Sequence, residues 1–426
     1  MPSIPNLDDG HDVLQPIAVT GMGLICPAGI NVPECWDNII NGNSAISDIS
    51  KRLRSETPVR IGGQFPESYY EYEKDNTPRK LLNRTSDSAR LVRLCAYQAL
   101  ENSGLEINWL NRERCGIVIG TSFAGEFAGA NYLHPANERF NVLRKMRSAL
   151  SAWPAIEFGF KGPHFTVSAT DASGAYAITH ACELIRSGQL DCALAGGVDT
   201  LATEYFIDQC STAGLLSRRN DEPARAMRPF DRDRDGFVIS EGCCVLFLES
   251  WRHARARQAD PYAWIRGYSC ATSAIGSNSE FEMAEQMAWR MESAIEAADI
   301  SRGKIGYINA YGISTKISDR QETHAIRSVF GERACDLVVS SPKSVFGHTM
   351  GASGAIDVAL SALTLFNAIA PPTINYESPD PDCNSNYVHN DALRLDQVKA
   401  AMSNSFGLGG QDCVIVLTRE DSTDEY

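Results

Sequence analysis

The stretch TVSATDASGAYAITHACELIRSGQLDCALAGGVDT, residues 166–200, carries the pattern that decides the fold. Its start belongs to an alternating segment, HFTVSA at 164–169, which is typical of a strand. A run with helical periodicity follows from Ala175 to Ser187, and the apolar segment CALAGGV at 192–198 predicts a second strand. Alternation of this kind predicts sheets sandwiched between helices, and therefore an α/β fold.

The same alternation continues on both sides of this stretch. Toward the N-terminus the predicted elements are a strand with a glycine turn at 17–29, helices at 33–42 and 86–102, and a strand at 115–121. Toward the C-terminus they are strands at 244–249, 304–312, 336–341 and 413–420, a helix at 319–330, and a glycine-rich turn into a helix at 347–363. The second half thus repeats the style of the first, which indicates duplication of half-chains rather than a short repeat.

A seam between the two halves is predicted near residue 260. A charged helical segment, Glu249 to Gln258, ends at Asp260-Pro261, and the strand-like segment AWIRGYS begins at 263. The first residues of the chain are polar. The expected divisions are a polar tail at 1–15, an N-terminal half at 16–260 and a C-terminal half at 261–426.

Composition narrows the classes of function. The 426 residues carry a formal net charge of -14, which repels phosphate backbones, so nucleic acid is not an expected partner. The chain starts without the basic and apolar segments of a signal peptide and has no apolar run of about 18 residues, so we expect a cytoplasmic protein without a membrane partner. The 13 cysteines lack CxxC spacing, which argues against a metal site and favours reduced core thiols.

Four further segments resemble those of the β-ketoacyl synthases, in the order that this family has them. They are VTGMGLICPAG at 19–29, RPFDRDRDGFVISEG at 228–242, SPKSVFGHTMGASGAIDVA at 341–359 and NSFGLGG at 404–410. The resemblance spans nearly the whole chain. It implies the thiolase-like fold, with two duplicated halves in an αβαβα layered arrangement, and chemistry on acyl carrier protein thioesters without a cofactor.

The resemblance also locates a degenerate catalytic site. In the family, a strand ends at a tight turn where a nucleophilic cysteine opens a helix, and counting back from Gly197 without a gap puts Asp171 at that position. A carboxylate that attacked a thioester would form a mixed anhydride, so acyl loading is not expected. Two interpretations remain open: Asp171 caps the helix or shapes a tunnel, or it has a chemical role.

The other members of this site also depart from the family in part. Tyr311 replaces the first of two histidines, and it either donates a hydrogen bond in its place or fills the vacated space. The second histidine and the nearby lysine correspond to His348 and Lys343, and Asp357 stands where the family usually has glutamate. We expect a Lys343–Asp357 ion pair, retained either for chemistry or because dismantling a buried charge network is costly.

The loss of the cysteine and the first histidine in an otherwise intact frame resembles the chain-length-factor subunits of type II polyketide synthases. That resemblance implies a heterodimer with a cysteine-bearing ketosynthase, in which this chain completes a tunnel for the phosphopantetheine-linked acyl chain of an acyl carrier protein. The retained GHTMGASG segment, residues 347–354, makes a reducing, polyene-making system as plausible as an aromatic one.

The same resemblance implies which residues line the tunnel: Gly125, Ala128, Tyr132 and Phe406. Because Gly125 and Ala128 are small, the tunnel is expected to pass them and to end at Tyr132 or at the partner subunit. Close helix packing is the alternative for the two small residues. Phe406 lies in a turn that gates the pocket in the family, although its neighbouring glycines could serve only the backbone angles.

Two contact surfaces are expected. The partner ketosynthase would pair along the edge near 166–171, where HFTVSA supplies β-branched and aromatic residues. The acidic carrier protein would dock on basic clusters such as Arg144, Lys145 and Arg147, for which a solvated helix face is the alternative.

Two other functions remain open at this stage. One is a stand-alone noncanonical acyltransferase or decarboxylase that uses Asp171, Tyr311 and His348 on an acyl thioester. The other is a carrier-protein-binding scaffold without a tunnel. The retained polar residues of the pocket are explained less well by the scaffold.

Overall fold

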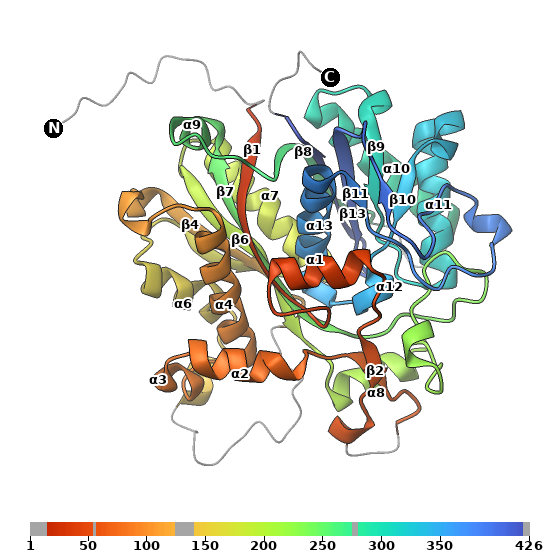
Figure 1. Ribbon diagram of the computed structural model, residues 1–426, viewed down its shortest axis with the longest axis horizontal. Coiled ribbons are helices and arrows are strands. Elements are labelled where there is room, and N and C mark those ends of the chain that lie inside the picture. Colours follow the sequence, from red (N-terminus) through yellow and green to blue (C-terminus); the bar gives the residue numbers. More distant parts are fainter. Residues whose placement is uncertain (1–14, 54–56, 124–139, 275–279, 421–426) are drawn as a thin grey trace.

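A mixed β-sheet forms the centre of the protein (Figure 1). The computed structural model describes residues 15–53, 57–123, 140–274 and 280–420. Within these residues, ten strands pair in the order β10-β9-β13-β14-β8-β1-β7-β6-β4-β5. The strands are β1 (Ile17–Ile25), β4 (Cys115–Gly120), β5 (His164–Val167), β6 (Cys192–Thr200), β7 (Glu241–Ser250), β8 (Ala263–Thr272), β9 (Ile305–Asn309), β10 (Val338–Ser340), β13 (Ala400–Phe406) and β14 (Gln411–Thr418).

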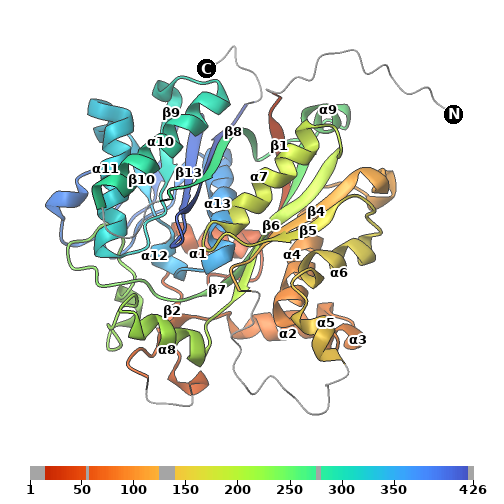
Figure 2. The same ribbon diagram turned by 180° about the vertical axis from the view of Figure 1, so that it is seen from behind.

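The sheet consists of two five-stranded parts, one from each half of the chain. They join where β1 and β8 pair antiparallel over three positions, Ile17 with Ile265 through Val19 with Ala263. Two helices lie between the parts, and others cover their outer faces, which gives the expected αβαβα layers (Figures 1 and 2). The inner helices are α7 (Ser173–Arg186) and α13 (Ser353–Asn367), and the outer ones include α4 (Asp87–Asn102), α6 (Ala149–Phe158), α10 (Glu280–Ala298) and α11 (Lys316–Phe330).

Shorter elements complete the layers and the loops around them. The short helices are α1 (Val32–Ile40), α2 (Glu67–Asn76), α3 (Arg79–Leu82), α5 (Asn141–Lys145), α8 (Glu204–Thr212), α9 (Trp251–Ala256) and α12 (Lys343–Phe346), and the short strands are β2 (Ile46–Asp48), β3 (Ile61–Gly63), β11 (Ile369–Ala370) and β12 (Leu393–Arg394). Local sequence explains several of their ends. The Asn31 side chain, for example, caps α1 by accepting a hydrogen bond from the backbone of Glu34.

Most of the predicted strands and helices are confirmed, and the exceptions have physical reasons. The segment 249–258 is not helical throughout, because Glu249 belongs to strand β7 and only Trp251–Ala256 is helix. Glu249 is buried and accepts hydrogen bonds from Thr20 and Arg257. Its charge was therefore misleading as a sign of an exposed helix. Strand β13 was not predicted as a strand, and only the turn at 404–410 was expected there. Its polar residues lack the apolar pattern of a buried strand, although every residue of the strand is buried.

The two inner helices begin in the same way. The sequence ASGA stands at 172–175 and again at 352–355. Each helix start is preceded by a turn with a residue at positive φ, Thr170 at 46° and Met350 at 49°. The two halves of the chain therefore repeat the same turn and helix start at the centre of the fold.

The first turns of these helices pack against each other without intervening side chains. A Cβ on Gly174 of α7 would lie 2.8 Å from the backbone nitrogen of Ala355, and one on Gly354 of α13 would lie 2.9 Å from that of Ala175. Glycine is therefore required at both positions by the close approach of two backbones. The contact fixes how far apart the two helix starts can be.

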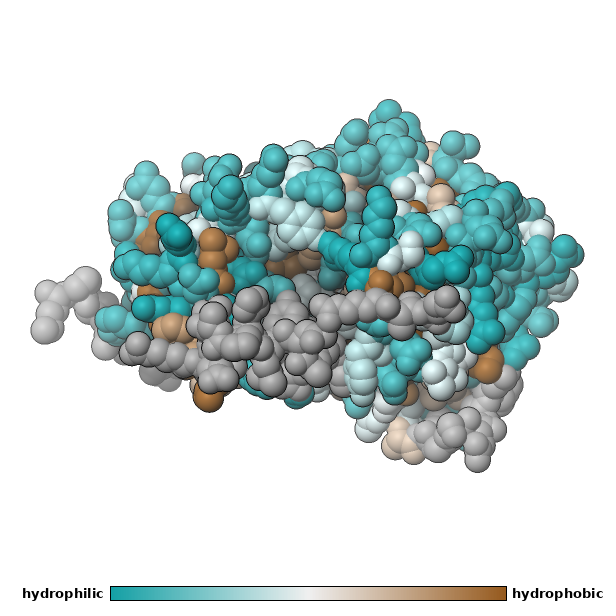
Figure 3. All heavy atoms as spheres, turned by 90° about the horizontal axis from the view of Figure 1, so that it is seen from below, coloured by the Kyte–Doolittle hydropathy of each residue, from teal (hydrophilic) through white to brown (hydrophobic). Residues whose placement is uncertain are grey.

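One helical stretch, Met350–Asn367, is long and apolar enough to cross a membrane, but 89% of it is buried inside the fold. It is therefore the core helix of this architecture. The face of the molecule seen in Figure 3 is mainly hydrophilic, with apolar side chains in scattered places.

Replacing Gly354 with valine tests the contact between the inner helices. We expect Gly354→Val to lower the free energy of unfolding by about 1–3 kcal/mol or more, because the added carbons meet backbone atoms that cannot move aside. Urea unfolding followed by circular dichroism measures this. Gly303→Val is the control, because there the added group meets the far end of the Arg333 side chain, and we expect a change within about 0.5 kcal/mol. Equal stabilities of the two variants would contradict the proposed constraint.

Candidate functional site

Asp171 lies in the turn between strand β5 and helix α7. The turn is held at Thr170, whose carbonyl accepts hydrogen bonds from the hydroxyls of Ser173 at 2.6 Å and Ser122 at 2.8 Å. The residue that caps α7 is Ala172, which provides no side-chain hydrogen bond to the helix. The interpretation of Asp171 as a helix cap is therefore wrong, because its carboxylate turns away from the helix toward other partners.

Those partners are Tyr311 and His348. The Tyr311 hydroxyl donates a hydrogen bond of 2.8 Å to Asp171 Oδ2, and His348 Nε2 lies 3.6 Å from Oδ1. The other imidazole nitrogen, Nδ1, lies 3.1 Å from the Ser353 hydroxyl, which fixes the ring so that Nε2 faces the carboxylate. The exposed fractions of Asp171, Tyr311 and His348 are 1%, 3% and 1%, so the cluster is closed to solvent.

The electrostatics of the cluster favour a charged Asp171. Burial by itself raises the pKa of this carboxyl. The charge and hydrogen bond of His348, the hydroxyl of Tyr311 and the backbone N–H of Leu408 outweigh burial and hold the pKa below its ordinary value. Tyr311 thus serves as a donor and is more than a space filler, while its own pKa is raised by burial and by the neighbouring Asp171 charge.

Glu322 positions the turn that carries Tyr311. Its carboxylate accepts hydrogen bonds of 2.9 Å from the backbone nitrogens of Tyr311 and Gly312, and another of 2.9 Å from the side-chain amide of Asn404. Burial raises the pKa of Glu322, against the lowering effect of these donors. Sequence reasoning missed this residue. The sequence pattern that could have revealed Glu322 is its spacing from the apolar Ala325 and Ile326, which places an acidic side chain on the buried face of α11.

The expected ion pair between Lys343 and Asp357 forms. Lys343 Nζ lies 2.6 Å from Asp357 Oδ2, both side chains are buried, and Nζ also lies 5.6 Å from the centre of the Tyr311 ring. Burial raises the pKa of Asp357, although the Lys343 charge counteracts this. The pair therefore lies beside the Asp171 cluster, and all five residues predicted for the degenerate site converge on one place.

Phe406 ends strand β13 next to this cluster. Its ring centre is 6.0 Å from that of Tyr311, in an edge-to-face arrangement. The following hairpin closes with a hydrogen bond of 2.8 Å from Gly407 N to the Gln411 carbonyl. A Cβ on Gly407 would lie 2.2 Å from the Thr170 hydroxyl, so a close approach requires this glycine. Phe406 and the hairpin thus cover the turn that presents Asp171.

The remaining predicted residues have different outcomes. Gly125, Ala128 and Tyr132 lie outside the described residues. Of the basic cluster, Arg144 is partly buried and donates hydrogen bonds to the carbonyls of Leu82 and Asn83, so it is occupied within the fold. Lys145 and Arg147 are exposed.

Asp199 is a further buried carboxylate that sequence reasoning missed. It accepts hydrogen bonds from the Thr121 hydroxyl at 2.7 Å and from the backbone nitrogens of Ser122 at 2.9 Å and Gly351 at 2.8 Å. Asp199 therefore connects the end of β4 with the turn before α13. Because His348 lies in the segment that leads into this turn, the connection helps to hold its side chain in place. No sequence pattern distinguished it, because its partners come from distant segments.

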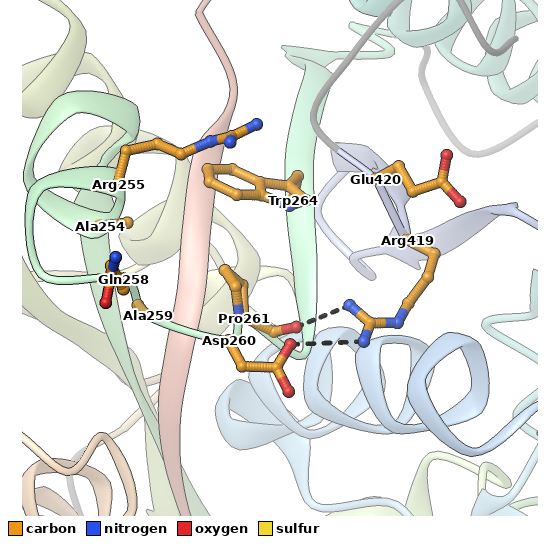
Figure 4. Close-up of a pocket in the computed structure, with 9 residues that line it drawn as sticks. All are labelled: Ala254, Arg255, Gln258, Ala259, Asp260, Pro261, Trp264, Arg419 and Glu420. Atoms are coloured by element: carbon orange, nitrogen blue, oxygen red, sulfur yellow. Dashed lines mark hydrogen bonds and ion pairs between the residues drawn. The ribbon is translucent and has the colours of Figure 1, made fainter.

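One surface hollow lies elsewhere. It has a volume of about 540 Å³, and Figure 4 shows Arg255, Trp264 and Arg419 among its lining residues. Strand β14 leads from Gln411, which contacts Thr170 near the cluster, to Thr418 just before this hollow. Seven residues of strand separate the two ends by roughly 23 Å. The hollow is thus distinct from the candidate site.

Comparison with known proteins identifies the family of the chain. Residues 14–254 match the model of the β-ketoacyl synthase N-terminal domain, and residues 262–377 match that of the β-ketoacyl synthase C-terminal domain. The chain belongs to the β-ketoacyl synthase family. Its fold is the thiolase-like α/β fold of ketosynthases.

Individual relatives extend the similarity along the full chain. A 3-oxoacyl-[acyl-carrier-protein] synthase 2 of Coxiella burnetii is 34% identical, over 95% of this chain and 98% of that protein. The ketoacyl synthase alpha subunit of the tetracenomycin polyketide synthase of Streptomyces glaucescens is also 34% identical, over 96% and 98% of the two chains.

Two solved structures are similar as well. One is a type II PKS acyl-carrier protein in complex with its ketosynthase bound to the hexaketide, with a TM-score of 0.83, 30% identity and coverage of 95% of this chain and 99% of that one. The other is the ishigamide ketosynthase/chain length factor, with a TM-score of 0.86, 26% identity and coverage of 95% and 99%. The protein is therefore related to 3-oxoacyl-[acyl-carrier-protein] synthases and to ketosynthases of type II polyketide synthases.

The hydrogen bond from Tyr311 to Asp171 predicts a pH-dependent loss of stability. We expect Tyr311→Phe to lower the free energy of unfolding by about 1.5–3 kcal/mol near pH 7, because a buried carboxylate loses a donor. The folded pKa of Asp171 is depressed, so its contribution is complete above the unfolded pKa of about 3.9 and is lost as pH falls through the lower folded value. The difference between wild type and variant should therefore shrink below about pH 4.

Tyr307→Phe is the matched control for this measurement. Tyr307 is also a fully buried tyrosine, but its hydroxyl lies 2.9 Å from the neutral Ser340 hydroxyl. Its loss should cost about 1 kcal/mol. That cost should stay constant between pH 3 and pH 6. The Asp171 account fails if the Tyr311→Phe effect is equally constant over this range.

Proposed function

We propose that this chain is the non-condensing, chain-length-factor subunit of a β-ketoacyl-[acyl-carrier-protein] synthase heterodimer, built from halves at 16–260 and 261–426. The observation that carries the proposal is Asp171 at the position of the family's cysteine. Its carboxylate is a poor nucleophile toward thioesters, and Tyr311 and His348 hold it in a closed, buried cluster. The acyl-transfer step therefore belongs to a partner that supplies the cysteine.

The similar proteins support this division of labour. A relative with comparable identity is named as an alpha subunit of a polyketide synthase ketoacyl synthase, and one solved neighbour is a ketosynthase/chain length factor. Another solved neighbour is a ketosynthase in complex with its acyl-carrier protein. By this likeness, the partners of the present chain are a cysteine-bearing ketosynthase and an acyl carrier protein with its phosphopantetheine-linked acyl chain, in the cytoplasm.

The edge of the sheet at β5 supports the pairing. Among the described residues, β5 is the last strand of the sheet and pairs on one side only, with β4. Apolar side chains are exposed beside it, with exposed fractions of 73% for Val142, 47% for Met146 and 71% for Ile156. Their helices are tied to the strand, since the Thr166 hydroxyl donates to the Arg147 carbonyl at 3.0 Å. We call this strand with these three residues the β5 face.

Such a face has the chemistry of an interface between subunits. An unpaired strand edge offers its backbone donors and acceptors to another strand, and exposed apolar side chains gain free energy when they are covered. A partner with the same fold would present an equivalent edge, so that two sheets become continuous. For carrier protein docking, Lys145 and Arg147 remain as exposed basic side chains near this face.

One observation favours a second candidate, the stand-alone acyltransferase or decarboxylase. Lys343, His348 and Asp357 are retained together with a hydrogen-bonded Tyr311. A catalytic cluster, however, must admit the substrate, and none of these side chains is more than 3% exposed. The buried ion pair has a structural reason to persist, because removal of one partner leaves an uncompensated charge.

Acylation separates the two candidates. We expect the isolated chain to keep its intact mass when it is incubated with acyl-acyl carrier protein, because Asp171 forms no stable acyl adduct. Asp171→Cys alone should not restore condensing activity, since Tyr311 also departs from the family. A cysteine-bearing family synthase in the same mixture serves as the positive control. A stable acyl adduct on the isolated wild-type chain would refute the subunit proposal in favour of the enzyme.

A charge on the β5 face should prevent pairing. We expect Ile156→Lys to abolish copurification with a coexpressed cysteine-bearing partner ketosynthase, because the interface would bury an uncompensated ammonium group. The control is Leu393→Lys on β12, where an apolar residue is 43% exposed outside the β5 face. Tagged pull-down and sedimentation measure the outcome. Equal pairing by the two variants would place the interface elsewhere.

A further inference from the structure

Two cysteines face each other across neighbouring strands in the C-terminal part of the sheet, next to its junction with the N-terminal part. Strands β8 and β14 pair antiparallel, and their register places Cys413 directly opposite Cys270. The two sulfur atoms are 3.1 Å apart. All 13 cysteines lie in the described part of the chain and are free thiols, so this contact joins two reduced side chains.

The two thiols differ in access. Cys413 is fully buried, whereas Cys270 is one of only two cysteines in the described chain that are not buried, the other being the exposed Cys335. Cys270 lies near the end of β8, where the strand emerges from the core. Cys270 is therefore the residue of the pair that a small reagent reaches first, and the Cys413 sulfur lies 3.1 Å from the Cys270 sulfur.

The surroundings of Cys270 favour a thiolate. The hydrogen bond with Cys413, the hydroxyl of Thr179 at 3.2 Å and the positive charge of Arg290 lower the pKa of Cys270, against the effect of burial. The same contact and burial raise the pKa of Cys413. The pair thus combines a partly exposed thiol whose pKa is lowered with a buried thiol whose pKa is raised.

Arg290 is a buried positive charge near the two cysteines, and its guanidinium lies 4.2 Å from the centre of the Trp289 ring. Its side chain comes from α10 and is only 2% exposed, and neither Nε nor Nη2 has a hydrogen-bond partner. A buried guanidinium with two unpaired nitrogens is costly. A negative charge on Cys270 would compensate it in part. Asp412 is a second acidic group that Arg290 acts on, although burial raises the pKa of its carboxyl to about 6 against the lowering effects of the Ser273 hydroxyl and of Arg290.

We propose that Cys270 and Cys413 form a redox-active dithiol that a small peroxide oxidises to a disulfide. The Cys270 thiolate attacks one peroxide oxygen, the O–O bond breaks, and a sulfenic acid forms while hydroxide leaves. The Cys413 sulfur then attacks the sulfenic sulfur, the S–O bond breaks, and the thiol proton leaves with the oxygen as water. Two thiols are oxidised to one disulfide, and hydrogen peroxide is reduced to two molecules of water.

The disulfide would act close to the candidate site. Beyond Cys270, the backbone nitrogen of Ser273 donates to the Gly410 carbonyl at 2.8 Å, and the Ser273 hydroxyl donates to Asp412 at 2.6 Å. These bonds hold the hairpin after Phe406 that covers Asp171. A covalent link between β8 and β14 therefore restrains the base of that hairpin.

The chain contains a matched control pair. Cys115 and Cys192 also face each other across adjacent strands, β4 and β6, with their sulfurs 3.2 Å apart. Both are buried, with exposed fractions of 1% and 0%, and the pKa of Cys192 is raised by its contact with Cys115 and by burial. Proximity is thus the same in both pairs, while access and charge differ.

The test is peroxide treatment of the full-length chain, purified together with its partner ketosynthase where the two copurify. After treatment with hydrogen peroxide, remaining thiols are alkylated and the peptides are mapped by mass spectrometry. We expect one disulfide between Cys270 and Cys413, with the loss of two hydrogen atoms in mass. We also expect Cys115 and Cys192 to stay reduced, and a thiol reductant to reverse the change.

Two variants define the mechanism. In Cys413→Ser the disulfide should be lost, and a sulfenic acid reagent such as dimedone should label Cys270. Arg290→Gln should slow the alkylation of Cys270 but not that of the exposed Cys335, with circular dichroism used to confirm the fold of each variant. The proposal is overturned if wild-type Cys270 and Cys413 both remain alkylatable while Cys335 is oxidised, or if the Cys115 and Cys192 pair oxidises first.

Discussion

The first turns of α7 and α13 meet with no side chain larger than a methyl group between them. This contact determines the geometry of the candidate site, because a residue of that site lies a few positions before the start of each helix. Asp171 stands two residues before α7, and His348 stands five residues before α13. The distance between the carboxylate and the imidazole is therefore set by two glycines, Gly174 and Gly354, that take no part in the chemistry. A larger residue at either would separate the halves of the cluster.

The buried charges around this contact differ in what stabilises them. Asp171 keeps a depressed pKa because a hydroxyl, an imidazole and a backbone N–H converge on it. Glu322 and Asp357 have raised pKa values, because burial outweighs the donors around them. Lys343 offsets part of that cost for both carboxylates, for Asp357 through a direct ion pair and for Glu322 through its charge alone. A network of this kind resists dismantling one residue at a time, because the loss of one partner leaves an uncompensated buried charge.

Sequence reasoning could predict the fold and the members of the cluster because both have linear signals. The alternation of strands and helices gave the layers, and the position of Asp171 in the 166–200 stretch gave the site. Strand β13 was missed because Ser403, Asn404 and Ser405 are polar, although the strand is buried on both faces. The direction of the Asp171 carboxylate was also beyond prediction. It depends on Tyr311, 140 positions away in the chain, and on the turn that Glu322 holds.

The open edge at β5 has a consequence for the cell as well as for the molecule. A strand with unpaired backbone groups and apolar neighbours accepts any complementary strand, including that of another copy or of an unfolded chain. In the proposed heterodimer, a subunit made in excess of its partner would expose this edge and become a substrate for chaperones and proteases. Balanced synthesis of the two chains is then a requirement that the geometry of one edge strand imposes on gene expression.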